Sequence, residues 1–145
     1  MVLKADWLYS SLLSRDQRII HGFSTRCLMS GEGDATTKEQ CESLISSLHI
    51  DPSRLQLMKQ VHKDQISFID TQSSLHPEVD AMTTDQPRIA LGIRTADCVP
   101  VLMFDPILRV IAAVHAGWRG AVAQLPLKTI REMSIRFGSK PEQIW

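Results

Sequence analysis

Residues 89–120 read IALGIRTADCVPVLMFDPILRVIAAVHAGWRG, and this stretch decides the fold class. It contains three short runs of apolar and β-branched residues, at 89–93, 99–104 and 110–114, and such runs are typical of buried strands. Asp105 and Pro106 supply turn chemistry between the second run and the third. We therefore expect these runs to form the core of the sheet in an α/β protein.

A helix is predicted directly after the last of these strands. It opens after Gly117, covers about residues 119–137 and ends at Gly138, a natural C-terminal cap. Pro126 falls inside it and should kink the helix or split off its first turn. Ile144 and Trp145 then read as the first residues of another strand. We therefore expect the chain to be truncated at its C-terminal end, as the N-terminal portion of a longer unit.

The first half of the chain is more polar and predicts shorter elements. A strand is expected at 18–23, and a helix over about 37–49 that begins with a capping box of Thr36 and Glu39. The apolar spacing of that helix places Cys41 on its buried face. Two strands are expected at 55–61 and 65–69, joined at 62–64. No repeat or linker interrupts the sequence, so 1–145 is predicted to be a single unit.

Composition excludes several classes of function. The 145 residues include 16 basic and 16 acidic side chains, and this balance leaves no excess positive charge for a nucleic-acid or anionic membrane surface. No apolar run approaches the roughly 18 to 20 residues that cross a bilayer. The first ten residues contain Asp6 and lack the basic-then-apolar order of a signal peptide. A cytoplasmic protein without nucleic-acid or membrane partners is predicted.

Three cysteines, Cys27, Cys41 and Cys98, form an odd and widely spaced set. This pattern argues against a disulfide framework and for reduced thiols, one of which is available for chemistry.

Three residues stand at strand ends or turns, where a sheet can direct side chains into one cleft: His62, Cys98 and His115. Their long spacings do not fit a zinc finger but do fit a site assembled from separate strands. Two imidazoles and a thiolate would leave an open position on zinc, as in catalytic sites, and the same donors accept copper. Without metal, Cys98 could act as a nucleophile with either histidine as its base. All three could also be ordinary structural residues.

Other polar residues near these positions suggest substrate contacts. Guanidinium groups suit phosphate or carboxylate recognition, and Asp97 could orient a histidine or transfer a proton. Trp118 could stack on a planar substrate or be buried at the start of the helix. The arginines concerned are Arg26, Arg94 and Arg119, and the glycines that would let the backbone approach a ligand are Gly22, Gly117 and Gly120.

Five segments, taken together, resemble the motifs of the YfiH family of laccase-domain proteins, also called the multicopper polyphenol oxidase family. They are 21–26 (HGFSTR), 60–62 (QVH), 80–84 (DAMTT), 95–102 (TADCVPVL) and 115–120 (HAGWRG). The resemblance implies an α/β fold with a layered mixed sheet and flanking helices, related to that of cytotoxic necrotizing factor. It also implies a zinc site whose ligands map onto His62, Cys98 and His115.

The same resemblance implies an enzyme of purine nucleosides. The implied reactions are phosphorolysis of adenosine, inosine and methylthioadenosine, and adenosine deamination, with a nucleoside and phosphate as partners. Arg26 and Arg119 are then candidates to hold phosphate or ribose, and Asp97 to assist proton transfer. The alternatives are a copper-dependent, laccase-like polyphenol oxidase, a metal-free cysteine hydrolase and a non-catalytic fragment that keeps the fold. Family members are substantially longer than this chain.

Overall fold

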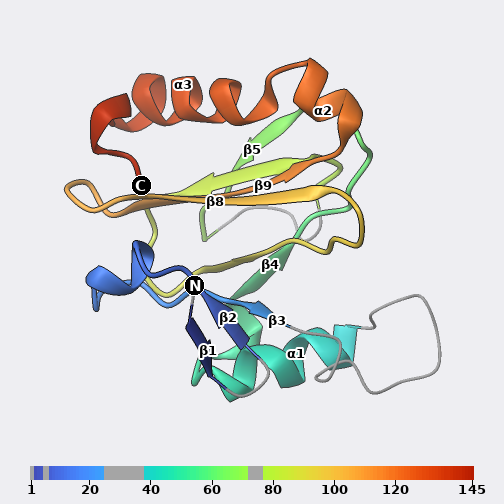
Figure 1. The fold of residues 1–145 in the computed structure, drawn as a ribbon, viewed down its shortest axis with the longest axis vertical. Helices are drawn as coiled ribbons and strands as arrows, with labels where there is room; N and C mark the ends of the chain where they lie inside the picture. Colours follow the sequence, from blue (N-terminus) through green and yellow to red (C-terminus); the bar gives the residue numbers. More distant parts are fainter. Residues whose placement is uncertain (1, 5–6, 25–37, 72–76) are drawn as a thin grey trace. The chain divides into compact units, whose positions relative to one another are not determined.

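Short strands precede a helical C-terminal segment in the computed structural model, which describes residues 2–4, 7–24, 38–71 and 77–145 (Figure 1). The chain divides into two units, Met1–Ser53 and Arg54–Trp145. Arg26, Cys27 and the predicted cap residue Thr36 lie outside the described residues. No helix in the described ranges is long and apolar enough to cross a bilayer.

The first unit holds a three-stranded antiparallel sheet and one helix. The sheet order is β1 (Val2–Lys4), β2 (Trp7–Tyr9) and β3 (Phe23–Ser24), and the helix is α1 (Lys38–Ser47). Cys41 is buried, as its helical spacing predicted. The helix ends earlier than predicted because the chain turns through His49, whose φ of 59° is left-handed.

The strand predicted at 18–23 is wrong for most of its length, since β3 begins only at Phe23. A local turn takes its place, in which the Asp16 carboxylate accepts a hydrogen bond from the Arg18 amide at 2.9 Å. Such side-chain bonds to the backbone compete with strand formation.

The second unit is built on a four-stranded mixed sheet in the order β5-β6-β9-β8. The antiparallel pairs are β8 with β9 and β6 with β9, whereas β5 pairs with β6 in parallel. The bounds of these strands are Ile66–Phe68 for β5, Ala81–Thr84 for β6, Val99–Asp105 for β8 and Val110–Ala116 for β9. The mixed sheet implied by the family resemblance is therefore present.

Apolar side chains cover both faces of this sheet. On one face, Leu125 and Met133 from α3 (Leu125–Phe137) pack with sheet residues that include Ala81 and Val114. Met82, the next residue along β6, belongs to a second cluster with Met58, Ile69 and Val79. Successive strand residues point to opposite faces, so β6 contributes to both layers. Figure 1 shows α3 lying along one side of the sheet and β4 beyond the other.

Two strand pairings differ from the sequence expectation. The 55–61 and 65–69 runs form β4 (Leu55–Leu57) and β5, which lie in different sheets. The 89–93 run forms β7 (Ala90–Gly92), which pairs in parallel with β4 rather than joining the main sheet. The apolar pattern indicates where strands are but not which neighbour each one takes, because pairing is decided by contacts distant in sequence.

The helix predicted after β9 is present, and its first turns are split off as expected from Pro126. It splits into α2 (Trp118–Val122) and α3, with left-handed Gln124 between them and Pro126 in the first turn of α3. Proline is tolerated there because the amides of a first helical turn have no partner within the helix. Gly138 caps α3 with a left-handed φ of 80°, as predicted.

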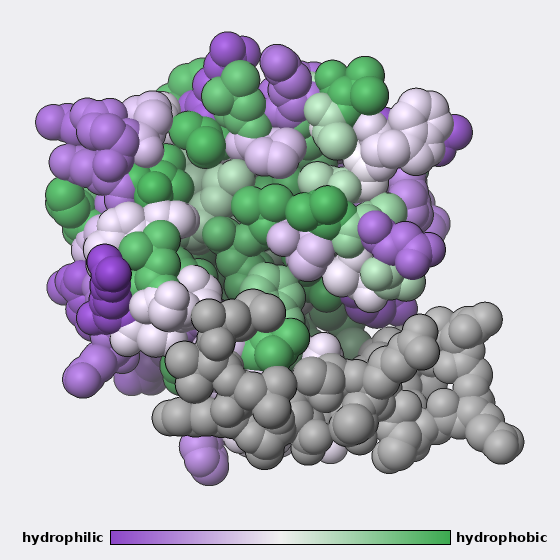
Figure 2. All heavy atoms as spheres, in the orientation of Figure 1, coloured by the Kyte–Doolittle hydropathy of each residue, from purple (hydrophilic) through white to green (hydrophobic). Residues whose placement is uncertain are grey.

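The last residue extends the main sheet at its β8 edge. The Trp145 amide donates to the Phe104 carbonyl at 2.9 Å, and the Phe104 amide donates to Trp145 at 3.1 Å. These reciprocal bonds agree with the strand expected to begin at 144–145. In Figure 2, hydrophobic side chains in green lie among hydrophilic ones in purple on the viewed surface.

Candidate metal centre

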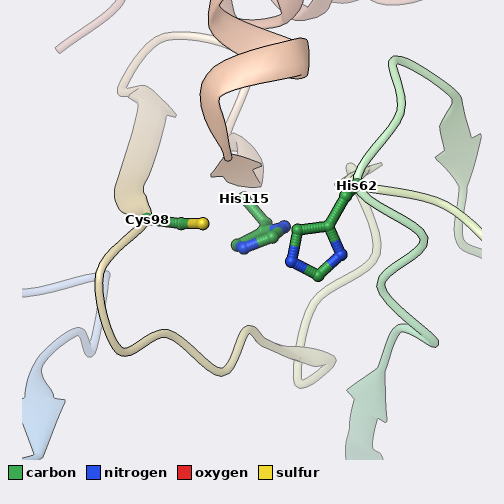
Figure 3. A group of neighbouring side chains, drawn as sticks. All are labelled: His62, Cys98 and His115. Atoms are coloured by element: carbon green, nitrogen blue, oxygen red, sulfur yellow. The ribbon is translucent and has the colours of Figure 1, made fainter.

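Three segments of the second unit bring His62, Cys98 and His115 together (Figure 3). His115 lies near the end of β9, and Cys98 directly precedes β8, whose first residue pairs with Ala116. His62 follows β4 in the loop that leads to β5. One potential ligand atom from each side chain lies within 4.8 Å of the others. The approach that the sequence suggested for these three residues is thus present.

The group runs from the interior to the surface. His115 is 2% exposed, Cys98 is half-buried and His62 is exposed. The two imidazole rings meet edge to face, with centroids 4.8 Å apart and an interplanar angle of 89°. His62 has a φ of 58°, a left-handed conformation that costs energy for a residue with a side chain. A strained residue at the solvent side of a polar cluster is typical of functional sites.

Asp80 contacts the group of candidate ligands from its buried side. Its side chain is fully buried, and its Oδ1 lies 2.9 Å from Nδ1 of His115. The pairing of Ala81 with Val114 places Asp80 opposite His115, whose amide donates to the Asp80 carbonyl at 2.8 Å. Asp80 was not among the site residues predicted from the sequence. Its only signal was its position at the start of the 80–84 segment of the family resemblance.

Gln60 connects the loop of His62 to that of Cys98. Its side-chain amide donates to the Arg94 carbonyl at 2.7 Å and accepts from the Arg94 amide at 2.8 Å. These two hydrogen bonds link the segment that follows β4 to the segment that follows β7. The Thr95 hydroxyl in turn donates to the Cys98 carbonyl. The backbone on both sides of the group is therefore held by side-chain hydrogen bonds.

Asp64 links the same loop to helix α3 through an ion pair. Its carboxylate pairs with the ammonium of Lys128 on α3. The hydrogen bond from Lys128, together with its positive charge, lowers the pKa of Asp64 below its usual value. Both side chains are partly exposed, so this pair contributes little to stability.

The glycines singled out from the sequence have different roles. A Cβ on Gly117 would lie 3.3 Å from Cys98 Sγ and 3.5 Å from His62 Cδ2, so the backbone there borders the group directly. A Cβ on Gly120 would meet the Lys63 carbonyl, and one on Gly22 would meet the ring of Trp7. Of the three glycines, only Gly117 brings the backbone close to the candidate metal ligands, as predicted.

The remaining predicted site residues that fall within the described ranges lie on the surface. Asp97 is exposed in the turn before Cys98, and the carboxylate that contacts His115 is that of Asp80. The guanidinium of Arg119 stacks on the Trp118 ring, 4.5 Å from its centroid, and both residues are exposed. Trp118, at 70% exposure, is not the buried helix-start aromatic considered from the sequence. The roles of Asp97 and Arg119 stay predictions.

The donor set fits a metal ion. One thiol and two imidazoles are the donors that zinc and copper prefer, and Gly117 leaves room beside them where any other residue would place a Cβ. Within the described residues, this is the single group of three or more histidine, cysteine or acidic side chains suited to a metal.

Comparison with known proteins agrees with these features. A family model described as multi-copper polyphenol oxidoreductase laccase matches residues 24–145. The chain belongs to this family. Within the laccase family, the purine nucleoside phosphorylase of Streptomyces coelicolor is 37% identical over 116 residues, which cover 79% of this chain and 48% of that protein. The enzyme of the same name from Bacteroides thetaiotaomicron is 48% identical over 73 residues, 50% of this chain and 27% of that protein.

Solved structures share the laccase-family fold. YfiH of Bacillus licheniformis matches with a TM-score of 0.68 and 26% identity, over 74% of this chain and 43% of that one. YlmD of Geobacillus stearothermophilus matches with a TM-score of 0.69 and 23% identity, over 79% and 47% respectively, and this similarity concerns the fold alone. The chain thus spans about half the length, or less, of these relatives.

Proposed function

We propose that this laccase-family chain carries the metal centre of a zinc-dependent purine nucleoside phosphorylase, with His62, Cys98 and His115 as ligands. The observation that supports the proposal is the convergence of three ligand atoms within 4.8 Å at a centre open to solvent on its His62 side. The relatives named purine nucleoside phosphorylase supply the substrate class. A cytoplasmic location belongs to the same proposal.

In phosphorolysis, phosphate replaces the purine at the ribose. Different side chains have different roles in this reaction. His62, Cys98 and His115 would hold a zinc ion, which would supply a Lewis acid for negative charge that develops on the substrate. Arg119, with Arg26, provides guanidinium groups for phosphate or ribose, and Trp118 offers an exposed ring beside Arg119. Asp97 moves a proton to or from the purine. The same centre would carry out adenosine deamination.

A copper-dependent phenol oxidase is the second candidate, because thiolate and imidazole also bind copper and the family description names that activity. The single ligand group in the described part of the chain favours nucleoside chemistry, since a multicopper oxidase needs several such groups. Metal content and oxygen uptake with a phenol distinguish the two.

Metal analysis of the purified chain tests the centre. We expect about one zinc per chain, lost in Cys98→Ser because the thiolate ligand is removed. Cys41→Ser, in the first unit, is the matched control and should keep its metal. No metal in the wild type, together with rapid alkylation of Cys98, would overturn the zinc centre and favour a cysteine hydrolase.

Turnover tests the reaction. Inosine and phosphate should yield hypoxanthine and ribose 1-phosphate, and Cys98→Ser should abolish the release of hypoxanthine. If the chain binds zinc but turns over no nucleoside, whereas a longer form extended beyond Trp145 does, the chain is a non-catalytic portion of the enzyme. Copper content with phenol-dependent oxygen uptake would instead support the oxidase.

A further inference from the structure

We propose that Asp80 is the positioning residue of the metal centre, setting the tautomer of one ligand and the backbone of another. Asp80 is fully buried and precedes β6, opposite His115 on β9. The inference rests on the proposed function in one respect, because it takes His115 as a metal ligand.

Three backbone N–H groups and a ring nitrogen of His115 surround the Asp80 carboxylate. Oδ1 accepts from the amide of His62 at 2.9 Å and lies 2.9 Å from Nδ1 of His115. Oδ2 accepts from the amides of Lys63 at 2.8 Å and Val61 at 3.3 Å. Two of these partners, His62 and His115, belong to the candidate ligand set, and they meet at the same oxygen.

The chemistry of this oxygen fixes the proton on His115. An ionised carboxylate has acceptors only, so Nδ1 of His115 carries the hydrogen and donates it. The neutral ring then has its lone pair on Nε2, the atom that must face the metal. In metal sites, a carboxylate on the far nitrogen of a histidine orients the ring and raises its basicity.

The same carboxylate stabilises the loop of His62. Three successive amides, from Val61 to Lys63, point at Asp80, although His62 has the disfavoured φ of 58°. These hydrogen bonds to a buried charge offset the cost of that conformation. Asp80 therefore fixes the backbone position from which the imidazole of His62 extends. It also determines which ring nitrogen of His115 carries no proton and can bind the metal.

Asparagine has nearly the same shape as aspartate but cannot replace it here. With its NH₂ group toward Val61 and Lys63, the amides of these two residues lose the one oxygen that accepts from both and face a donor instead. With the NH₂ group toward His115, Nδ1 must become the acceptor, and the proton moves to Nε2, where it blocks the metal. The second orientation also removes the acceptor of the His62 amide, so either orientation disturbs at least one of the two ligands, and Asp80→Asn should weaken metal binding.

The first experiment uses the metal-free wild-type chain, so that no variant of Asp80 has to fold. Long-range ¹⁵N–¹H NMR of the imidazoles, at about pH 8 where histidine is ordinarily neutral, reports which nitrogen carries the proton. The His115 signals are assigned by their loss in His115→Gln. We expect the proton on Nδ1. A proton on Nε2 in the wild type would overturn the proposal.

The second experiment compares zinc affinity by competition with a chromophoric chelator. We expect Asp80→Asn to weaken zinc binding by about 10- to 100-fold, the usual effect of losing a partner of a ligating histidine. Asp105→Asn is the matched control, because Asp105 is also fully buried and also accepts loop amides, but at the far end of β8. It should keep wild-type zinc affinity and the wild-type tautomer.

The results separate this inference from the proposed function. Wild-type zinc binding with equal affinity in Asp80→Asn would overturn the role of Asp80 and leave the centre intact. Equal losses of affinity in Asp80→Asn and Asp105→Asn would reduce Asp80 to a structural residue and overturn the proposal. If the wild type bound no zinc, the proposed function would fail, and the role of Asp80 in metal binding would fail with it, whatever the tautomer.

Discussion

Gly117 is the clearest case in which a single residue limits the centre. Its φ of −65° and ψ of 169° are open to any amino acid, so the backbone does not require glycine. The surrounding space disfavours a side chain, since a Cβ would lie in tight contact with Cys98 Sγ, at 3.3 Å, and in contact with His62 at 3.5 Å and His115 at 3.8 Å. All three neighbours are candidate ligands, so even one added methyl group would act on the ligand set.

We expect Gly117→Ala to weaken zinc binding by about 5- to 150-fold, because overpacking of this kind costs roughly 1–3 kcal/mol. Chelator competition measures the change. Gly138→Ala is the control: its Cβ would meet open space, and its left-handed φ should lower stability by about 1 kcal/mol without changing zinc affinity. Wild-type affinity in Gly117→Ala would contradict the expected crowding.

The site was partly predictable from single residues. His62, Cys98 and His115 could be named because their chemistry and their positions at strand ends are visible in sequence. Asp80 could not, because a lone aspartate reveals nothing of a partner 35 residues away until β6 and β9 are paired. Gln60 was missed for the same reason, since its partners are backbone groups of Arg94.

At the scale of elements, the register of β9 assembles the centre. One neighbouring strand brings Asp80 beside His115, and the other brings Cys98 beside Gly117. The hairpin of β8 and β9 was predictable because both strands are apolar and a turn sequence joins them. β6 was not, because its two threonines make it look polar although all four of its residues are buried. The parallel pairing of β4 with β7 depends on long-range contacts that no local pattern reveals.

The turn between β8 and β9 leads to a prediction on pH dependence. Burial raises the pKa of Asp105, but hydrogen bonds from the amides of Leu108 and Ile107, together with the nearby Ser139 side chain, outweigh burial and hold that pKa below its usual value. The folded chain thus binds this proton less tightly than the unfolded chain. Its stabilising effect is complete above the unfolded pKa and is lost as the pH falls through the folded pKa.

We therefore expect Asp105→Asn to lower the free energy of unfolding by about 1–2 kcal/mol at neutral pH, and by progressively less as the pH falls below about 4. Urea unfolding of both proteins across this range measures the difference. A gap that stayed constant, or widened in acid, would contradict the assigned role of the carboxylate.

At the scale of the whole molecule, the three candidate ligands come from one of the two units. His62, Cys98 and His115 all lie within Arg54–Trp145, as do Asp80 and Gln60, which hold them in place. The first unit contributes no described residue to the ligand group. Metal binding should therefore stabilise the second unit. This expectation concerns the chain as it stands, which spans about half the length of its relatives.

Hydrogen–deuterium exchange with and without zinc tests this division. At a free zinc concentration about one hundred times Kd, binding should stabilise the folded second unit by about 2.7 kcal/mol. Exchange should slow most in peptides covering 58–65, 79–84, 94–101 and 112–120, where the ligands and their hydrogen-bond partners lie. Peptides covering 7–24 and 41–53 should exchange as they do without metal, because a ligand stabilises only the structure that its binding requires. Equal protection in both units would show that they unfold as one cooperative body, and protection confined to the first unit would overturn the assigned ligands.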